Sequence, residues 1–264
     1  MTFADLLDAA DFTETGLNVT IGEGWTQGRT VYGGVTAALC LAAACRRVAP
    51  GRPLRSAMIT FAGPSAGAVS VETELLREGR TASSVRARLS SGAGIGVEAV
   101  FTFSAGRDSV LDQAAPRPPR GGIEAPGPDA EPLVFPEGAP EFTRRLDFVW
   151  ASRTAPFSGA DEGYELSWVR HKDEASRALP LGLIALADAL PPAACTTLST
   201  FAPLSSMTWM IDMLVDEPQT REGWWLLEAR ADHSARGHSS QDMTIWNADG
   251  QCVIKGRQMV TVFV

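Results

Sequence analysis

Two side chains suited to activating a water molecule interrupt apolar stretches in the second half of the sequence. Asp188 lies in the segment Leu-Ala-Asp-Ala-Leu, and Gln258 lies on an apolar run that follows Gly250. A buried carboxylate or amide is costly without polar partners, so both positions need a physical reason. A carboxylate can take a proton from water, and an amide can help aim that water at a carbonyl carbon. The alternatives are an exposed position for either side chain, or a helix cap at Asp188 before Pro191.

A pair of glycines, Gly33 and Gly34, precedes a long apolar segment in the first half. Residues 35–48 are rich in Ala and Leu and end with Arg46 and Arg47, a pattern that predicts a buried helix. Free N–H groups at the start of a helix can stabilise a negative charge that develops on a carbonyl oxygen. Glycine there also lets a substrate approach the backbone closely, although a simple tight turn would use the same residues.

The elements around these residues predict an antiparallel sheet with one long helix in each half. In the second half, residues 179–190 have a helical pattern that matches the helix at 35–48 in the first half. Runs of alternating or continuous apolar residues, joined by short turns, follow each helix and indicate strands. The predicted strands are 54–61, 69–76, 82–89, 97–103, 207–215, 224–231, 241–246 and 252–263.

The two halves are related by an internal repeat. Arg80 aligns with Arg236 and Gly94 with Gly250, both at an offset of 156 residues. A single repeat of this length indicates two copies of a whole domain rather than a solenoid. Two unrelated β-rich domains that share common turn residues are the alternative.

A proline-rich stretch separates the halves. Residues 106–140 contain eight prolines, a composition typical of a linker that runs over the surface rather than of a regular element. We therefore expect an N-terminal domain at residues 1–105 and a C-terminal domain at residues 141–264.

The order and spacing of several short motifs resemble bacterial acyl-CoA thioesterase II over nearly the whole chain outside the linker. The resemblance implies an α+β fold made of two fused hotdog domains, each a long helix wrapped by an antiparallel sheet. The motifs are Val31-Tyr-Gly-Gly-Val, Phe61-Ala-Gly-Pro64, Leu75-Leu-Arg-Glu-Gly-Arg80-Thr-Ala-Ser, Ala187-Asp188, Ser234-Ala-Arg-Gly237, Asp249-Gly250 and Gln258.

The same resemblance implies the reaction, which is hydrolysis of an acyl-CoA thioester to a free acid and CoA. In that family an Asp orients and deprotonates the water, while a hydroxyl residue, usually Thr, and a Gln position it. Ser205 and Thr208 lie close enough to Ser206 that either could supply the hydroxyl. The implied residues are Asp188, Ser206 and Gln258 for catalysis, and Tyr32, Gly33 and Gly34 for substrate binding.

Charge and composition exclude several other classes of function. The net charge is −8, Lys172 and Lys255 are the only lysines, and no basic run stands out, so a nucleic-acid partner is not expected. The start of the chain lacks the pattern of a signal peptide, and the longest apolar stretch, 35–45, is too short to span a bilayer. We therefore expect a cytoplasmic protein that makes no membrane contact.

The Cys and His residues do not suggest a metal or a disulfide. The four cysteines have no Cys-x-x-Cys spacing, and the three histidines are scattered, so we expect free thiols, no metal and no cofactor. Gly63-Pro64-Ser65-Ala66-Gly67 matches the nucleophile-elbow pattern literally, but a strand follows it where that motif needs a helix. This segment therefore predicts a turn between strands.

Two rival functions remain at the level of sequence. Hotdog enoyl-CoA hydratases and dehydratases use an Asp followed shortly by a His, whereas Asp188 is followed by Ala-Leu-Pro-Pro-Ala-Ala and no His. A non-catalytic protein that binds acyl-CoA or an acyl chain is the second rival. A fused repeat can act as a monomer, and the sequence leaves a homo-oligomer and the type of acyl group open.

Overall fold

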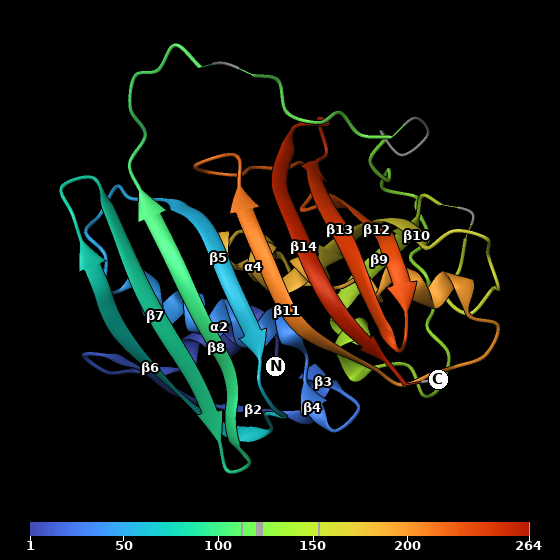
Figure 1. Ribbon diagram of the computed structural model, residues 1–264, viewed down its shortest axis with the longest axis horizontal. Coiled ribbons are helices and arrows are strands. Elements are labelled where there is room, and N and C mark those ends of the chain that lie inside the picture. Colours follow the sequence, from blue (N-terminus) through green and yellow to red (C-terminus); the bar gives the residue numbers. More distant parts are fainter. Residues whose placement is uncertain (112, 120–123, 153, 264) are drawn as a thin grey trace.

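The computed structural model describes residues 1–111, 113–119, 124–152 and 154–263, so short parts of the predicted linker and C-terminal domain lie outside it. The fold is α+β, with one large antiparallel sheet on one side of two central helices (Figure 1). The helices are α1 (Phe3–Asp8), α2 (Gly33–Cys45), α3 (Glu174–Arg177) and α4 (Pro180–Ala187), with 3-10 helices η1 (Glu23–Trp25), η2 (Glu141–Arg145) and η3 (Ala193–Thr197).

Twelve strands form the large sheet in the order β1-β2-β6-β7-β8-β5-β11-β14-β13-β12-β10-β9, and β3 pairs with β4 separately. The two halves meet where β5 pairs with β11, with Met58 opposite Met210. The strands are β1 (Asp11–Phe12), β2 (Gly16–Ile21), β3 (Thr26–Gln27), β4 (Thr30–Val31), β5 (Leu54–Phe61), β6 (Gly67–Glu78), β7 (Ala82–Ser91), β8 (Gly94–Ser104), β9 (Leu146–Trp150), β10 (Tyr164–His171), β11 (Leu204–Met213), β12 (Trp225–Ala235), β13 (His238–Asn247) and β14 (Cys252–Val262).

The internal repeat is visible in the strand pairing as well as in the sequence. Register shifts, which mark an extra residue in one strand of a pair, occur in both hairpins of each half. Each shift in these hairpins of the first half recurs 156 positions later in the second. The shifts fall between Leu75/Arg77 and Ala231/His233, and between Leu89/Ser90 and Ile245/Trp246.

The central helices are shorter than their sequence pattern suggested. The predicted helix at 35–48 is α2 at Gly33–Cys45, and the predicted helix at 179–190 is α4 at Pro180–Ala187. Asp188 is therefore the C-cap residue of α4, with φ −95° and ψ 13°, and not an interior helical residue. Pro191 and Pro192 follow closely, and proline disfavours the helical conformation in the residue before it.

Several elements were not expected from the sequence pattern. The predictions omitted the N-terminal elements before α2, the edge strand β9 and its neighbour β10. They also began the strand after α4 at residue 207, whereas β11 begins at Leu204 and includes Ser206. The mixed polar and apolar residues at its start hide this strand, because a short irregular run carries a weak period-2 signal.

The segment that follows β8 contacts the outer face of the sheet in the second half. Trp246 belongs to a small buried cluster there with Trp168 and Trp224, separate from the main core. The indole N–H of Trp246 donates to the carbonyl oxygen of Pro116 at 2.9 Å. Within the described residues between Ser104 and Glu141, no helix or strand forms, and part of this segment covers apolar sheet surface.

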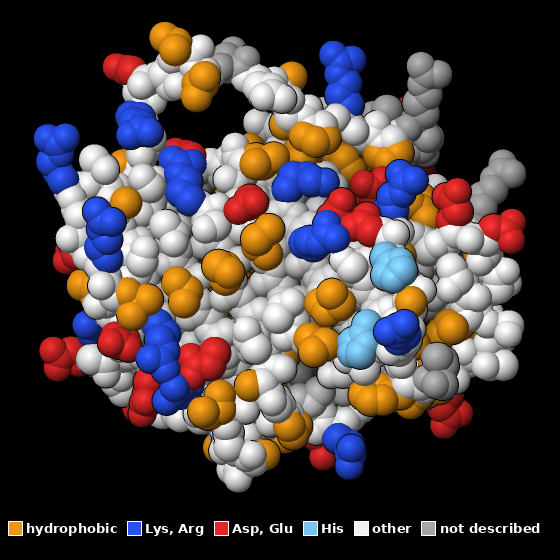
Figure 2. Space-filling model, viewed as in Figure 1, with side chains coloured by type: hydrophobic (Ala, Val, Ile, Leu, Met, Phe, Trp, Pro, Cys, Tyr) orange, Lys and Arg blue, Asp and Glu red, His pale blue; other side chains and the backbone are white. Residues whose placement is uncertain are grey.

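The outer face over the middle of the sheet is a mosaic of apolar and charged side chains (Figure 2). Met58 and Met210 are exposed there, on the two strands that join the halves. The main core lies on the opposite face, around α2 and α4. Among the described helices, none has both the length and the hydrophobicity needed to cross a lipid bilayer.

The close approach of α2 to α4 gives a first prediction. A Cβ at Gly34 would lie 2.4 Å from the carbonyl oxygen of Ala185 and 2.6 Å from the hydroxyl of Tyr32. Gly34→Ala should therefore push the helices apart and lower the free energy of unfolding by about 1–3 kcal/mol, as overpacking does. Urea denaturation measures the loss.

Gly22→Ala is the matched control, because a Cβ at Gly22 would meet no atom within 4 Å. Its φ of −75° is also open to alanine. If Gly34→Ala and Gly22→Ala unfold at the same urea concentration, the helix contact is not as tight as described.

Candidate active site

A cleft of ≈ 620 Å³ lies where the two halves meet, and most of the candidate residues line it. Its walls come from the start of α2, the end of β5, the residues after α4, the start of β11 and the middle of β14. Asp188, Gln258, Ser206 and Gly33 are all in the lining. The structure thus brings together four of the six residues that the sequence singled out.

Asp188 and Gln258 are in direct contact. The amide Nε2 of Gln258 donates to Oδ1 of Asp188 at 2.5 Å, across 70 positions of sequence. Gln258 lies on β14 and is only 3% exposed, so the amide that contacts Asp188 is held at a fixed point of the sheet. The sheet therefore determines where the carboxylate points.

The N-terminus of α2 meets the other side of the same carboxylate. A Cβ at Gly33 would lie 2.6 Å from Oδ2 of Asp188 and 3.0 Å from the ring of Phe61, so only glycine fits between them. The backbone N–H of Gly34 also interacts with the carboxylate. The first N–H groups of a helix have no partner within the helix, and here they face Asp188.

Burial raises the pKa of Asp188 from its usual value to about 7. The hydrogen bonds from Gln258 and Gly34 act in the opposite direction, because they favour the charged form. A carboxyl group with a pKa near neutrality can take a proton at physiological pH and is still ionised in a large fraction of molecules. Such a strongly shifted acid in a cleft is typical of a functional site.

Two of the three hydroxyl residues considered from the sequence line the cleft. Ser205 and Ser206 both line it, whereas Thr208 does not. Ser206 pairs with Val260 of β14, two residues from Gln258, and a register shift follows it before Thr208. Ser205 and Ser206 are therefore the hydroxyls that β11 brings to the cleft, and Thr30, Thr36 and Ser65 line it from the first half.

Tyr32 and Gly34 lie behind the cleft wall rather than in the lining. The ring of Tyr32 stacks on Phe142 of η2, with centroids 3.9 Å apart and an interplanar angle of 7°. Its hydroxyl is buried and has no hydrogen-bond partner among the described residues. Burial and the nearby Asp188 raise its pKa well above the usual value, so this hydroxyl stays neutral and supports the wall beneath the carboxylate.

One residue that the sequence analysis did not single out belongs to the same group. Gln241 on β13 is 1% exposed and donates from Nε2 to Oε1 of Gln258 at 2.9 Å. A polar residue on the inner, apolar face of a predicted strand was the available signal. Its role could not be inferred from the sequence, because its partners Gln258 and Ala193 come close to it only in the folded chain.

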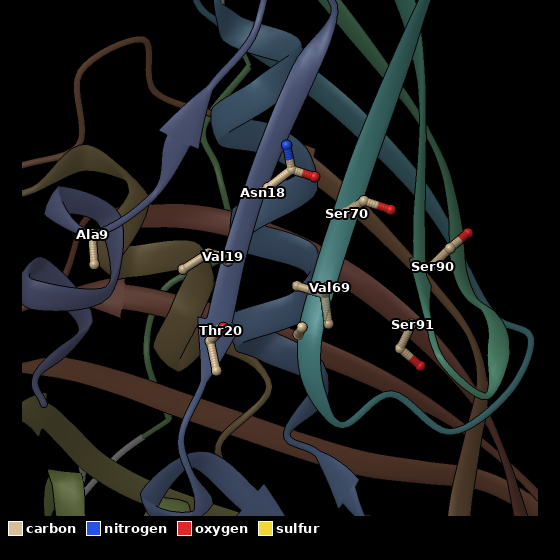
Figure 3. Close-up of a pocket in the computed structure, with 9 residues that line it drawn as sticks. Ala9, Asn18, Val19, Thr20, Val69, Ser70, Ser90 and Ser91 are labelled. Carbon is tan, nitrogen blue, oxygen red and sulfur yellow. The ribbon is translucent and has the colours of Figure 1, made fainter.

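Two further hollows differ from this cleft in their chemistry. One of ≈ 490 Å³ lies beside α1, β2 and β6 and is lined by small polar and apolar side chains (Figure 3). The other, of ≈ 350 Å³, includes His171, whose Nε2 is 2.9 Å from the carbonyl oxygen of Gly182. Burial lowers the pKa of His171, and its ring stacks on Phe3, which is the environment of a structural histidine.

Within the described residues, no three His, Cys, Asp or Glu side chains lie together as a metal site requires. The absence of a metal and of a cofactor stays a prediction. The four cysteines are free thiols, three of them buried.

Comparison with known protein families shows to which family this chain belongs. The model of the acyl-CoA thioesterase C-terminal domain matches residues 117–262, and that of the N-terminal domain matches residues 21–105. The chain belongs to the acyl-CoA thioesterase family. No curated protein sequence matches the chain, so this assignment rests on the family models.

Solved structures that resemble this acyl-CoA thioesterase family member share its fold at low sequence identity. A conserved protein of unknown function with hot dog fold from Alicyclobacillus acidocaldarius has a TM-score of 0.81 and 21% identity, covering 100% of this chain and 99% of that one. Acyl-CoA thioesterase II TesB2 from Mycobacterium marinum has a TM-score of 0.73 and 17% identity, covering 99% and 98%. The dehydratase domain of RzxB from Pseudomonas fluorescens has a TM-score of 0.51 and 13% identity, covering 98% and 99%. The fold is therefore the hotdog fold, which hosts more than one chemistry.

The raised pKa of Asp188 predicts a pH-dependent cost in stability. The pKa of Asp188 is about 7 in the folded protein and near the usual 3.8 in the unfolded chain, so between these pH values the folded protein holds a proton that the unfolded chain releases. Stability should therefore fall as pH rises through this window, by at most about 4 kcal/mol. Asp188→Asn lacks this penalty and should be more stable than wild type at pH 8.

Urea denaturation of both proteins from pH 4.5 to 8 measures this difference. Asp249→Asn is the control, because Asp249 is exposed and paired with Arg221 on the surface. A stability difference between Asp188→Asn and wild type that stays constant over this range would contradict the raised pKa.

Proposed function

We propose that this protein hydrolyses acyl-CoA thioesters to a free acid and CoA, with Asp188 as the general base. The contact between Asp188 and Gln258, in a cleft that Ser205 and Ser206 also line, supports this function most strongly. Membership of the acyl-CoA thioesterase family supports the substrate class. The proposed role in the cell is acyl-CoA turnover in lipid metabolism.

In the proposed mechanism, Asp188 accepts a proton from a water molecule as the water oxygen bonds to the thioester carbonyl carbon. The electron pair of the C=O bond moves onto its oxygen, where the backbone N–H of Gly33 at the start of α2 stabilises the negative charge. The intermediate then collapses, the C–S bond breaks, and the leaving CoA thiolate takes the proton from Asp188. The amide of Gln258 and the hydroxyl of Ser206 hold the water in line.

The pKa of Asp188 suits this role, because burial and hydrogen bonding act on it in opposite directions. A general base works best when its pKa lies near the working pH, because it is then both ionised and basic enough. Burial raises the pKa of Asp188 to about 7 and the two hydrogen bonds limit the rise. The rate should therefore increase with pH through about 7, as the carboxyl group loses its proton.

We also infer that the chain consists of two fused hotdog domains, at residues 1–105 and 141–264, joined by residues 106–140. The recurrence of both register shifts at an offset of 156 supports this division. The contact of the joining segment with the outer sheet face supports a linker that is held down rather than free. A cytoplasmic location and a homo-oligomeric state remain predictions.

Two observations favour hydrolysis over its rivals. A hotdog hydratase needs a His shortly after the Asp, whereas the groups that hydrogen-bond Asp188 here are the amide of Gln258 and the backbone N–H of Gly34. A non-catalytic binding protein has no use for a carboxylate with a pKa near 7, because burial of that group costs stability.

The central prediction is that purified protein releases CoA from one or more members of an acyl-CoA panel, detected with a thiol reagent. Asp188→Asn and Gln258→Ala should each lower kcat by about 10²–10⁴-fold, the usual contribution of general base catalysis. Asp249→Asn, on the surface, should retain the parent rate. Binding of acyl-CoA without release of CoA would favour the non-catalytic rival.

Ser206 is expected to position the water and not to attack the thioester itself. A serine becomes a strong nucleophile when a base takes its proton and a third group orients that base, whereas here the carboxylate of Asp188 is bonded to an amide. Ser206→Thr should keep much of the activity and Ser206→Ala should lose only part of it, about one hydrogen bond's worth of 1–3 kcal/mol.

Intact-protein mass spectrometry of a quenched reaction tests this directly. We expect no added acyl mass. An acyl group that maps to Ser206 and turns over at the catalytic rate would establish an acyl-enzyme route instead.

A further inference from the structure

We propose that Gln241 is a positioning residue for the reaction, which sets the orientation of the Gln258 amide through a one-way chain of hydrogen bonds that starts at the backbone of Ala193. This inference rests on the proposed function of the cleft. Gln241 does not line the cleft and touches neither Asp188 nor the space for substrate. Its influence therefore passes through Gln258.

The chain has three hydrogen bonds in series. The N–H of Ala193, the first residue of η3, donates to Oε1 of Gln241 at 2.8 Å. Nε2 of Gln241 donates to Oε1 of Gln258 at 2.9 Å, and Nε2 of Gln258 donates to Oδ1 of Asp188 at 2.5 Å. The two glutamines lie directly opposite each other on β13 and β14 and are almost fully buried.

The direction of this chain follows from its first donor. A backbone N–H can only donate, so the oxygen end of the Gln241 amide must face Ala193. The NH₂ end of Gln241 then faces Gln258 and requires an oxygen there, which turns the NH₂ end of Gln258 toward Asp188. Reversal of either amide would place oxygen against oxygen or N–H against N–H in a buried site, which is costly.

The direction matters because the two ends of an amide have opposite effects on a carboxylate. With its NH₂ end toward Asp188, Gln258 stabilises the ionised base. An amide nitrogen carries two hydrogens, so the second N–H of Gln258 remains for a water in the cleft that Gln258 lines. With its oxygen toward Asp188, Gln258 would favour the protonated acid, which cannot act as a base.

The first half of the repeat shows what these positions contain where no such site exists. The offset of 156 relates Gln241 to Val85, and the residue opposite Val85 on the neighbouring strand is Phe101. Val85 and Phe101 are both fully buried. The same scaffold thus packs well with an apolar pair, and a buried pair of amides is costly unless both are hydrogen-bonded. In the second half the amide pair lies where Gln258 can donate to Asp188.

The test is a double-mutant cycle between Gln241→Met and Gln258→Ala. Methionine nearly matches glutamine in size but can neither accept from Ala193 nor donate to Gln258. We expect Gln241→Met to lower kcat about 10-fold or more, with KM within about twofold. In the Gln258→Ala background, Gln241→Met should lower kcat no further, because the residue through which it acts is gone.

The pH profile gives a second readout that a structural role would not move. The free amide of Gln258 can turn in Gln241→Met, so the pH at which activity appears should rise by about half a unit. The hydroxyl of Tyr32, the other titratable group against Asp188, stays neutral in this range because its pKa is raised well above the usual value. The shift can therefore be assigned to Asp188.

Thr244→Val is the matched control. Thr244 lies on the same strand, is buried, and hydrogen-bonds Lys255 outside the chain of amides. It should cost stability without a change in kcat or in the pH profile. If Gln241→Met does not fold, Gln241→Asn keeps an amide that is too short to bridge Ala193 and Gln258, and the same losses are expected.

The outcomes separate this inference from the proposed function. Wild-type protein that releases no CoA from any acyl-CoA would overturn the function and this role with it. Active wild type with unchanged kcat and pH profile in Gln241→Met, or additive losses in the double mutant, would overturn the role of Gln241 alone.

Discussion

The site depends on one contact, in which the C-terminal end of α4 brings the carboxylate of Asp188 against the N-terminal end of α2. A Cβ at Gly33 would overlap Oδ2 of Asp188, and a Cβ at Gly34 would overlap the backbone of α4. The helices can therefore approach so closely only because both residues are glycines. Since each half of the molecule supplies one of these helices, the contact also holds the halves together at the cleft.

The scaffold is built twice but the polar site once. Both halves share two hairpins and the places where the strands of these hairpins change register. The equivalent inner-face positions contain Val85 and Phe101 in the first half, and Gln241 and Gln258 in the second. Two similar halves could in principle carry two equivalent sites. The side chains at a few buried positions decide that the buried amide pair lies in the second half.

Much of the fold could be predicted from the sequence, because it depends on local patterns. The apolar segment that becomes α2, the alternating strands of the hairpins and the turn residues at an offset of 156 are each visible within a short window. The edge strand β9 and its neighbour β10 were missed, since β9 is short and part of the inner face of β10 is polar, with Ser167 and His171.

The site was harder to predict than the fold, because its contacts join distant residues. Asp188 and Gln258 were singled out as polar residues in apolar runs, and the structure brings them together. The end of α4 was placed too late, so Asp188 was expected inside a helix and is instead its cap. Gln241 was overlooked, since its partners come from η3 and β14 and no short window contains all three.

The choice of an amide as the partner of Asp188 has a physical reason. An Arg or Lys beside the carboxylate would keep it ionised, but would lower its pKa by about 1–3 units and weaken it as a base. No partner at all would leave burial to raise the pKa further and keep the acid protonated. A neutral donor that is held in one orientation gives a pKa between these two cases, in agreement with the value of about 7. Arg29, the basic side chain among the described lining residues of the cleft, is exposed to solvent. The pKa of Asp188 is therefore set by burial and by the opposing hydrogen bonds from one amide and one backbone N–H, whose effect depends on direction rather than on charge.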